Sequence, residues 1–153
     1  MSQHTAFLRW SEGNLPFTAE SYNRDHTWTT GSGVEVPATS APEYKGSTDR
    51  VNPEEAFVGA LASCHMLTFL AIASKKRLTV LAYEDDPVGT LEQNAAGKMA
   101  ITRVELRPRV RFGGTPPDDA ALHQLHDRAH ANCFIANSVS CEVVTTPLPW
   151  IAG

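Results

Sequence analysis

Residues 52–77 read NPEEAFVGALASCHMLTFLAIASKKR and carry the strongest structural signal in the chain. Between Ala56 and Ala73 this segment holds 18 residues without Asp, Glu, Lys or Arg. Asn52 suits a helix N-cap, Pro53 suits the first helical position, and the two acids that follow suit the positive end of the helix dipole. We therefore predict a helix from Pro53 to about Lys75, with basic residues at its negative end.

The apolar side chains of this helix point in every direction instead of forming one stripe. Such a helix is either buried or in a membrane, and 18 uncharged residues are close to the lower limit for a span. Small and polar residues interrupt the run and no aromatic belt flanks it, which favours a core helix. Because 153 residues have difficulty covering such a helix on all sides, we expect part of it to pack against a second copy of the chain.

Strands are expected on both sides of the helix. Runs of β-favouring residues, separated by Gly- and Pro-rich segments, predict them. The expected strands are Thr5–Trp10, Pro16–Tyr22, Thr79–Leu91, Lys98–Phe112 and Val139–Thr146, and Asp25–Val36 is expected to add another strand or a hairpin. This order of elements indicates an α+β fold, and the length of 153 residues indicates a single domain over 1–153.

A second helix should follow Thr115, which we interpret as its N-cap. Leu122, Leu125, Ala129 and Cys133 recur at spacings of three and four and should face inward. His123, His126 and His130 also lie three and four apart, a spacing that can hold a metal ion. No HExxH or CxxC motif accompanies them, so a solvated polar face is favoured over a metal-binding module.

Charge excludes some partners. The net charge is −4 and the sequence pI is about 5.8, which argues against a nucleic-acid-binding surface. Arg103, Arg107 and Arg111 alternate with apolar residues along the expected strand Lys98–Phe112, and we interpret them as a solvated strand face and not a phosphate-binding track. The N-terminus has no basic segment followed by an apolar one, so we expect a cytoplasmic protein.

The three cysteines, Cys64, Cys133 and Cys141, are too few for a disulfide scaffold. A cysteine in an apolar helix is usually an inert small hydrophobe, because burial raises the thiol pKa. Two features favour reactivity at Cys64: its polar neighbours Ser63 and His65, and a second helix-associated thiol at Cys133. A nucleophilic thiol and a resolving thiol are sufficient for peroxide reduction through a sulfenic acid and a disulfide.

Two segments of the chain resemble a known family. Asn52-Pro53-Glu54-Glu55, followed by Ala60-Leu61-Ala62-Ser63-Cys64-His65, and the downstream Ala131-Asn132-Cys133 with Asn137-Ser138 are similar to the OsmC/Ohr family of osmotically inducible and organic hydroperoxide resistance proteins. The resemblance spans about Arg24 to Val144. It implies an intertwined α+β homodimer in which antiparallel sheets wrap around long central helices, with active sites at the subunit interface.

The resemblance also implies roles for four residues. Cys64 would be the peroxidatic thiolate, Cys133 the resolving thiol, Arg24 the activating cation and Glu54 the carboxylate that holds it. A fixed guanidinium lowers a thiol pKa and holds the thiolate. Arg50 is a rival to Arg24, and Cys141 is interpreted as structural, though it could replace Cys133 as resolver.

Helix geometry constrains this assignment. Ten residues of straight helix place Glu54 roughly 15 Å along the axis from Cys64. Either the helix breaks, with Gly59 a plausible place, or the two residues meet through different subunits. In the family many second cysteines precede proline, whereas Phe134 follows Cys133 here.

The expected function is thiol-dependent reduction of organic hydroperoxides, with no metal and no organic cofactor. The expected partners are a second copy of the chain, the hydroperoxide and a dithiol reductant, for which the family implies lipoyl-type compounds; a membrane and nucleic acid are not expected. The alternative is a dimer of the same fold that binds an apolar ligand without peroxidase activity.

Overall fold

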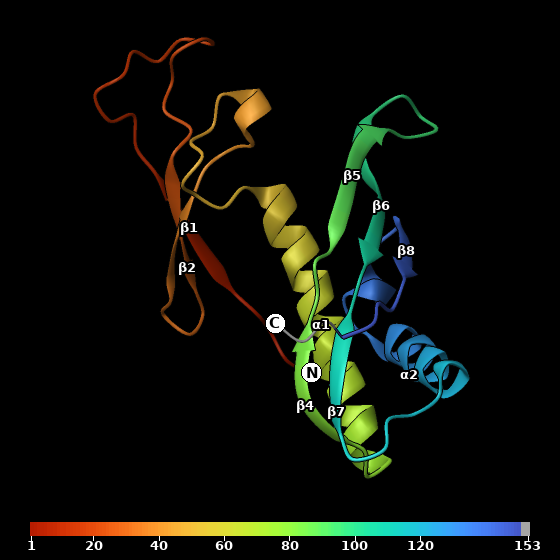
Figure 1. Cartoon of the computed structure of the whole chain (residues 1–153). Coiled ribbons are helices and arrows are strands. Elements are labelled where there is room, and N and C mark those ends of the chain that lie inside the picture. Colours follow the sequence, from red (N-terminus) through yellow and green to blue (C-terminus); the bar gives the residue numbers. More distant parts are fainter. Residues whose placement is uncertain (151–153) are drawn as a thin grey trace. The chain divides into compact units, whose positions relative to one another are not determined.

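The computed structural model describes residues 1–150, and its chain divides into two compact units, 1–56 and 57 onward. Helix α1, Pro53–Lys75, begins in the first unit and continues through the second (Figure 1). The α+β class is confirmed, since the elements are two long helices and eight strands within the described residues. The single domain expected over 1–153 stays a prediction.

The N-terminus of α1 is closed by reciprocal hydrogen bonds. The backbone N–H of Glu55 donates to Oδ1 of Asn52 at 2.8 Å, and the N–H of Asn52 donates to Oε2 of Glu55 at 3.2 Å. This arrangement satisfies two N–H groups that lack partners inside the helix. The predicted start at Asn52-Pro53 and end at Lys75 are both confirmed.

One face of α1 is buried within the chain. Its buried residues recur at intervals of three or four positions, and they are Leu61, Ala62, His65, Phe69 and Ala73. On another side of the helix Leu67 is 60 % exposed. A single chain therefore covers one side of this apolar helix and leaves another open.

The first unit contains a three-stranded antiparallel sheet in the order β1-β2-β3, with β1 Ala6–Trp10, β2 His26–Thr30 and β3 Glu35–Ala38. The strand expected over Thr5–Trp10 is confirmed, and Asp25–Val36 forms most of the β2–β3 hairpin. The strand expected over Pro16–Tyr22 is wrong. Here the chain turns, because the Ser21 hydroxyl donates to the carbonyl of Pro16 at 2.8 Å and the N–H of Tyr22 to that of Thr18 at 3.0 Å.

The second unit contains five strands in two sheets. β4 Thr79–Glu84 pairs antiparallel with β7 Arg109–Gly113. The other sheet has the order β5-β6-β8, formed by Val88–Gln93, Met99–Leu106 and Glu142–Thr145. Its β6–β8 pairing is parallel, and the closing strand is shorter than the expected Val139–Thr146.

The two long strands expected after α1 are each divided. Thr79–Leu91 is interrupted between Glu84 and Val88, and Lys98–Phe112 is interrupted at Arg107-Pro108. Pro108 has no N–H to donate to a strand ladder, and Pro87 has the same effect in the first break. Each expected strand therefore contributes to both sheets of the unit.

Helix α2, Asp119–Asn132, begins later than expected. Asp118 is its N-cap, since its Oδ1 accepts from the N–H of Ala121 at 2.8 Å. The expected cap Thr115 is wrong because it would place Pro116 at the first helical position, and a residue before a proline, here Pro117, is disfavoured in helical conformation. The inward stripe is confirmed by the burial of Leu125, Ala129 and Cys133.

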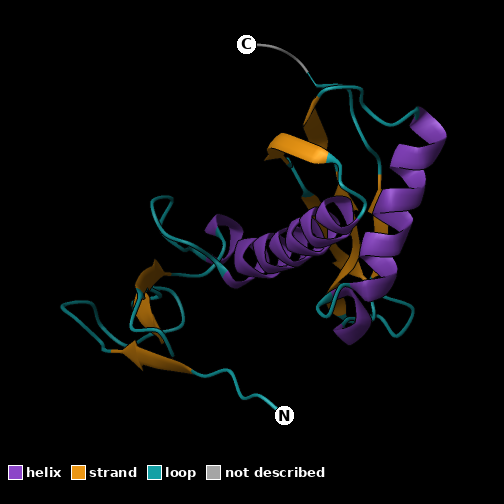
Figure 2. Cartoon of the chain, turned by 90° about the horizontal axis from the view of Figure 1, so that it is seen from below, coloured by secondary structure: helices purple, strands orange, loops and turns teal. Residues whose placement is uncertain are grey.

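Two apolar clusters form the core of the second unit. In the first, Leu61 and Ala62 of α1 meet Val104 and Leu106 of β6 together with Cys133. In the second, Phe69 and Ala73 of α1 meet Leu125 and Ala129 of α2. The helices therefore pack against each other and against the sheets, as Figures 1 and 2 show.

The arginine face of the expected strand Lys98–Phe112 is an ion-paired surface. Arg103 pairs with Glu142 of β8, and Nη2 of Arg107 lies 2.9 Å from Oε2 of Glu105. The interpretation as a solvated face agrees with these pairs, because charges already partnered by carboxylates are less available to a phosphate.

A buried histidine pair links α1 to α2. Nε2 of His65 lies 3.0 Å from Nδ1 of His126, the rings stack, and each side chain is 1 % exposed. The predicted solvated face of His123, His126 and His130 is therefore wrong for His126; only His123 is exposed and His130 is half-buried. His126 turns inward because the stripe of Leu125 and Ala129 is wide enough to include it.

Burial lowers the pKa of His65 to about 4, with a contribution from His130, and lowers that of His126 to about 3, with contributions from His65 and His123. Both rings are neutral in the folded protein at neutral pH, whereas a histidine of the unfolded chain has a pKa of ~6.5. Above that pH the pair causes no pH dependence of stability. As the pH falls from about 6.5 towards 4, the unfolded chain gains protons that the folded chain does not, so stability decreases.

We predict that the free energy of unfolding decreases between pH 7 and pH 5 by about 2 kcal/mol per buried imidazole. The double variant His65→Leu/His126→Leu should lose most of this dependence, because its unfolded chain lacks the two imidazoles that take up these protons. Urea unfolding at both pH values measures it, with His123→Leu as the exposed-histidine control. Equal pH dependence in the wild-type and double-variant proteins would contradict the prediction.

Candidate functional site

The structure brings Cys64 and Cys133 together. Cys64 lies in the middle of α1, and Cys133 is the C-cap of α2; both pack in the first apolar cluster. Cys133 is fully buried and Cys64 is half-buried, and both are free thiols. The two thiols influence each other's acidity, since Cys133 lowers the pKa of Cys64 and Cys64 raises that of Cys133.

The environment of Cys64 favours the thiolate. Burial raises the pKa of this thiol, but the backbone N–H of Ile135, the Cys133 thiol, the N–H of Phe134 and the Thr68 hydroxyl all lower it, and the net result is a pKa below the usual value. The backbone N–H groups of two successive residues thus favour the anionic form of one thiol. Both residues follow directly after Cys133, the C-cap of α2.

The other two thiols stay protonated more readily. Burial and the neighbouring Cys64 raise the pKa of Cys133, although the N–H of Ala136 donates to its sulfur at 3.4 Å. Burial also raises the pKa of Cys141, which packs against the same apolar cluster just before β8. Cys64 is therefore the most acidic of the three thiols, and Cys133 is its thiol neighbour.

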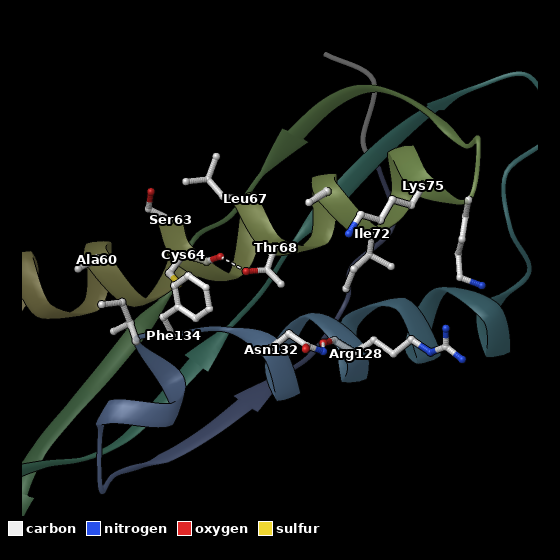
Figure 3. A pocket seen from close by; sticks show the side chains of 13 residues that line it. Ala60, Ser63, Cys64, Leu67, Thr68, Ile72, Lys75, Arg128, Asn132 and Phe134 are labelled. Atoms are coloured by element: carbon white, nitrogen blue, oxygen red, sulfur yellow. Dashed lines mark hydrogen bonds between the residues drawn. The ribbon is translucent and has the colours of Figure 1, made fainter. Parts of the chain in front are cut away.

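A hollow of about 990 Å³ opens beside Cys64 (Figure 3). Most of its wall is apolar and comes from one side of α1 and the C-terminal end of α2. Leu67 and Phe134 contribute, and Phe134 is 81 % exposed. The volume suits a ligand of many carbon atoms.

Arg24 and Glu54 line a separate hollow of about 250 Å³ in the first unit. The Arg24 guanidinium donates to the carbonyls of Tyr22 and Ala19 and lies 3.7 Å from the centroid of the Tyr22 ring. Nε of Arg24 and Oε2 of Glu54 are buried without a hydrogen-bond partner among residues 1–150. The two groups share a cavity, and each retains an unused polar atom.

Arg50, the rival of Arg24, is occupied by another carboxylate. Its Nε lies 3.1 Å from Oδ2 of Asp25, whose Oδ1 accepts from the Ser47 hydroxyl at 2.7 Å. Although burial raises the pKa of Asp25, bonds from Ser47 and Thr39 together with Arg50 hold it below the usual value. Arg50 therefore has an ion-pair partner, and Arg24 does not among the described residues.

No break separates Glu54 from Cys64. α1 is continuous through Gly59, so the expected break is wrong. Ten residues of unbroken helix correspond to about 15 Å along its axis, more than the two side chains can span. Within one chain Glu54 does not contact Cys64.

Sequence reasoning missed the backbone N–H groups of Phe134 and Ile135, which lower the pKa of Cys64. No residue type signals a backbone donor, so only the resemblance around Cys133 pointed to this loop. Among residues 1–150, no group of three His, Cys, Asp or Glu side chains is placed to hold a metal ion. His123 and His126 instead face different environments.

α1 is also long and apolar enough to cross a membrane by length and composition alone. Within the chain its buried face packs against α2 and the sheets. A core helix of a soluble protein passes the same test of length and composition.

Comparison with known proteins gives a consistent picture. The structure of an OsmC-like protein of unknown function from Vibrio cholerae superimposes with a TM-score of 0.93 at 45 % identity, over 97 % of this chain and 100 % of that one. An uncharacterised protein of Bacillus subtilis is 26 % identical over 124 residues, 79 % of this chain and 82 % of its own.

Organic hydroperoxide resistance proteins share the fold. The protein from Legionella pneumophila gives a TM-score of 0.73 at 15 % identity, over 99 % of this chain and 98 % of that one. The organic hydroperoxide resistance protein OhrB of Bacillus subtilis gives a TM-score of 0.69 at 18 % identity, over 97 % of this chain and 98 % of that one. The model of the OsmC-like protein family matches residues 46–147, which include both Cys64 and Cys133. This chain therefore belongs to the OsmC-like protein family.

Proposed function

We propose that this protein reduces organic hydroperoxides with Cys64 as the peroxidatic thiolate and Cys133 as the resolving thiol. The observation that carries the proposal is the position of Cys64, whose pKa is lowered beside a protonated, fully buried second thiol and at the wall of an apolar hollow. Organic hydroperoxide resistance proteins share this fold, which is consistent with the assignment.

The chemistry balances with these two thiols. The Cys64 thiolate attacks the terminal oxygen of ROOH; an S–O bond forms, the O–O bond breaks, and RO⁻ takes a proton to leave as ROH. The Cys133 thiol then condenses with the sulfenic acid, forming the disulfide and releasing water. An external dithiol restores both thiols by exchange.

We assign Arg24 and Glu54 to the same reaction in a homodimer. Each has an unused buried polar atom and lines a shared cavity of the first unit, which supports a carboxylate that fixes a guanidinium. Since Glu54 and Cys64 of one chain cannot meet on an unbroken α1, the Arg24–Glu54 pair would serve the Cys64 of the partner.

Uncovered apolar surface supports the second copy. In the first unit Phe7, Leu8, Phe17 and Val34 are each more than half exposed, and all of β1 is exposed. In the second unit Leu67 leaves an apolar side of α1 open. Surfaces of this kind mark protein–protein contacts.

A ligand-binding dimer without peroxidase activity is the second candidate, and the size of the hollow favours it. The two candidates differ in the fate of the thiols. Titration of free thiols before and after one equivalent of cumene hydroperoxide should show a loss of two thiols per chain for the peroxidase. No loss would favour the binding protein.

Cys64 should be alkylated by iodoacetamide before the other two cysteines, with a rate that reaches half its maximum at a lower pH than theirs. Mass spectrometry of peptides sampled from pH 6 to 9 measures each site. The reason is the lowered pKa of Cys64 against the raised pKa of Cys133 and Cys141. Preferential labelling of Cys141 would overturn the choice of nucleophile.

Cys64→Ser should abolish turnover of cumene hydroperoxide, whereas Cys133→Ser should allow a single turnover that stops at the sulfenic acid of Cys64. Cys141→Ser is the matched control and should retain the wild-type rate. Stopped-flow peroxide consumption and dimedone trapping of the sulfenic acid provide the measurements. If Cys64→Ser reduced cumene hydroperoxide at the wild-type rate, the proposed mechanism would be wrong.

Mixed dimers test the origin of Arg24. Arg24→Ala and Cys64→Ser should each be nearly inactive alone, but their co-expressed heterodimer should regain one intact site if Arg24 acts on the partner's Cys64. Activity of the purified, differently tagged heterodimer measures this. Without recovery, Arg24 acts within its own chain or plays no part.

A further inference from the structure

A threonine lies about one helical turn from Cys64. Thr68 is four residues further along α1, so its side chain is on the same side of the helix as that of Cys64. Both residues are half-buried and both line the hollow. Figure 3 shows them on its wall, with the Thr68 hydroxyl hydrogen-bonded to the backbone of Cys64. The hydroxyl and the thiol therefore share the same partly apolar surroundings.

The hydrogen bond that this hydroxyl makes is one that the helix does not need. Oγ1 of Thr68 donates to the carbonyl oxygen of Cys64 at 2.8 Å. In the continuous helix α1 the same oxygen also accepts from the backbone N–H of Thr68, four residues on. A carbonyl oxygen has two lone pairs, so the hydroxyl occupies only the second of them. When the hydroxyl turns away, the carbonyl keeps its helical hydrogen bond.

The hydroxyl can also act on the sulfur. A threonine hydroxyl rotates about its C–O bond, so one oxygen can donate to either of two nearby acceptors. The Thr68 hydroxyl is one of the groups that lower the pKa of Cys64, together with the backbone N–H groups of Ile135 and Phe134. The backbone fixes the direction of those N–H groups, whereas the hydroxyl is free to rotate. Its hydrogen bond can therefore form and break as the charge on the sulfur changes.

We propose that the Thr68 hydroxyl is a two-position hydrogen-bond donor that serves the reaction of Cys64. It donates to the carbonyl oxygen of Cys64 while Cys64 is a thiol, and it turns to the sulfur once the thiol has released its proton to solvent. When the sulfur loses its negative charge by attacking a peroxide, the hydroxyl returns to the carbonyl. Thr68 keeps its own proton throughout. Its part in peroxide reduction rests on the proposed function; its effect on the ionisation of Cys64 does not.

The test compares Thr68→Val, which keeps the shape of the side chain without the hydroxyl, with Thr68→Ser, which keeps the hydroxyl. Alkylation of Cys64 by iodoacetamide, followed by peptide mass spectrometry from pH 6 to 10, gives the midpoint of ionisation and the limiting rate. In Thr68→Val the midpoint should rise by about 0.5 to 1 pH unit, because hydrogen bonds to charged groups are among the stronger ones. Well below the midpoint the rate should fall about three- to tenfold. Thr68→Ser should keep the wild-type midpoint.

The limiting rate at high pH separates this role from a structural one. A thiolate that has lost a hydrogen bond is more basic and at least as nucleophilic, so the limiting rate of Thr68→Val should equal or exceed that of the wild-type protein. A substitution that merely displaced Cys64 would slow alkylation at every pH. An unchanged midpoint in Thr68→Val, or a lower rate over the whole pH range, would overturn the proposal.

Two other hydroxyls of α1 serve as matched controls. The Ser74 hydroxyl also donates to a carbonyl of this helix, that of Ala71 at 3.0 Å, but among residues 1–150 it is not one of those that line the hollow. Ser63 lines the hollow, but adjacent helix residues point about 100° apart, so it faces away from Cys64. Ser74→Ala and Ser63→Ala should each keep the wild-type midpoint. A shift in either variant as large as that of Thr68→Val would contradict a specific role for Thr68.

The other ionisable groups around Cys64 are the same in both Thr68 variants. They are Cys133 at the end of α2, Cys141 before β8, His65 of α1, which pairs inward with His126, and Lys75, Lys76 and Arg128 further along the hollow. A difference in midpoint between Thr68→Val and Thr68→Ser therefore reports on the hydroxyl.

Peroxide reduction provides a second measurement. In Thr68→Val, kcat/KM for cumene hydroperoxide should fall by the same factor as the alkylation rate at the same pH, and it should recover at high pH. If the alkylation midpoint shifts as expected while the wild-type protein reduces no hydroperoxide, the proposed function fails and the role of Thr68 stands. If hydroperoxide is reduced while the midpoint does not shift, the proposed function stands and the role of Thr68 fails.

Discussion

The uncharged run of α1 is the constraint on which the rest of the structure depends. Eighteen residues without charge must be removed from water, yet the chain supplies α2 and two sheets to only one side of them. Burying large apolar side chains contributes about 1.5–3 kcal/mol each, so the packing of Leu61 and Phe69 fixes how α1, α2 and β6 meet. The thiols are positioned as a consequence of that packing.

The thiol site uses both kinds of environment that α1 offers. Cys133 belongs to the sealed side of the helix, where burial keeps its proton in place. Cys64 lies at the border between the sealed and the open side, where successive N–H groups after α2 compensate for its partial burial. The two thiols beside α1 therefore differ in acidity, because Cys133 lies within the core and Cys64 at its edge.

The sequence predicted the parts of the fold that depend on local patterns. The capping residues at Asn52 and the inward stripe at Leu125 and Cys133 act locally, and both were correct. The strand breaks near Pro87 and Pro108 and the inward turn of His126 depend on which sheet or helix lies opposite, which no single segment encodes. For the site, the family resemblance predicted the pairing of the two thiols. It could not predict the backbone N–H groups that lower the pKa of Cys64, because any residue type carries such a group and only the folded backbone positions it.

The complete burial of Cys133 gives the proposed cycle a fixed order of events. An external dithiol cannot approach a sulfur that has no exposed surface, so it must attack the disulfide at Cys64, from the hollow. The same hollow would admit the hydroperoxide. Oxidant and reductant would then occupy one space at different times, so the two half-reactions could only alternate, and high concentrations of either reactant would inhibit the other.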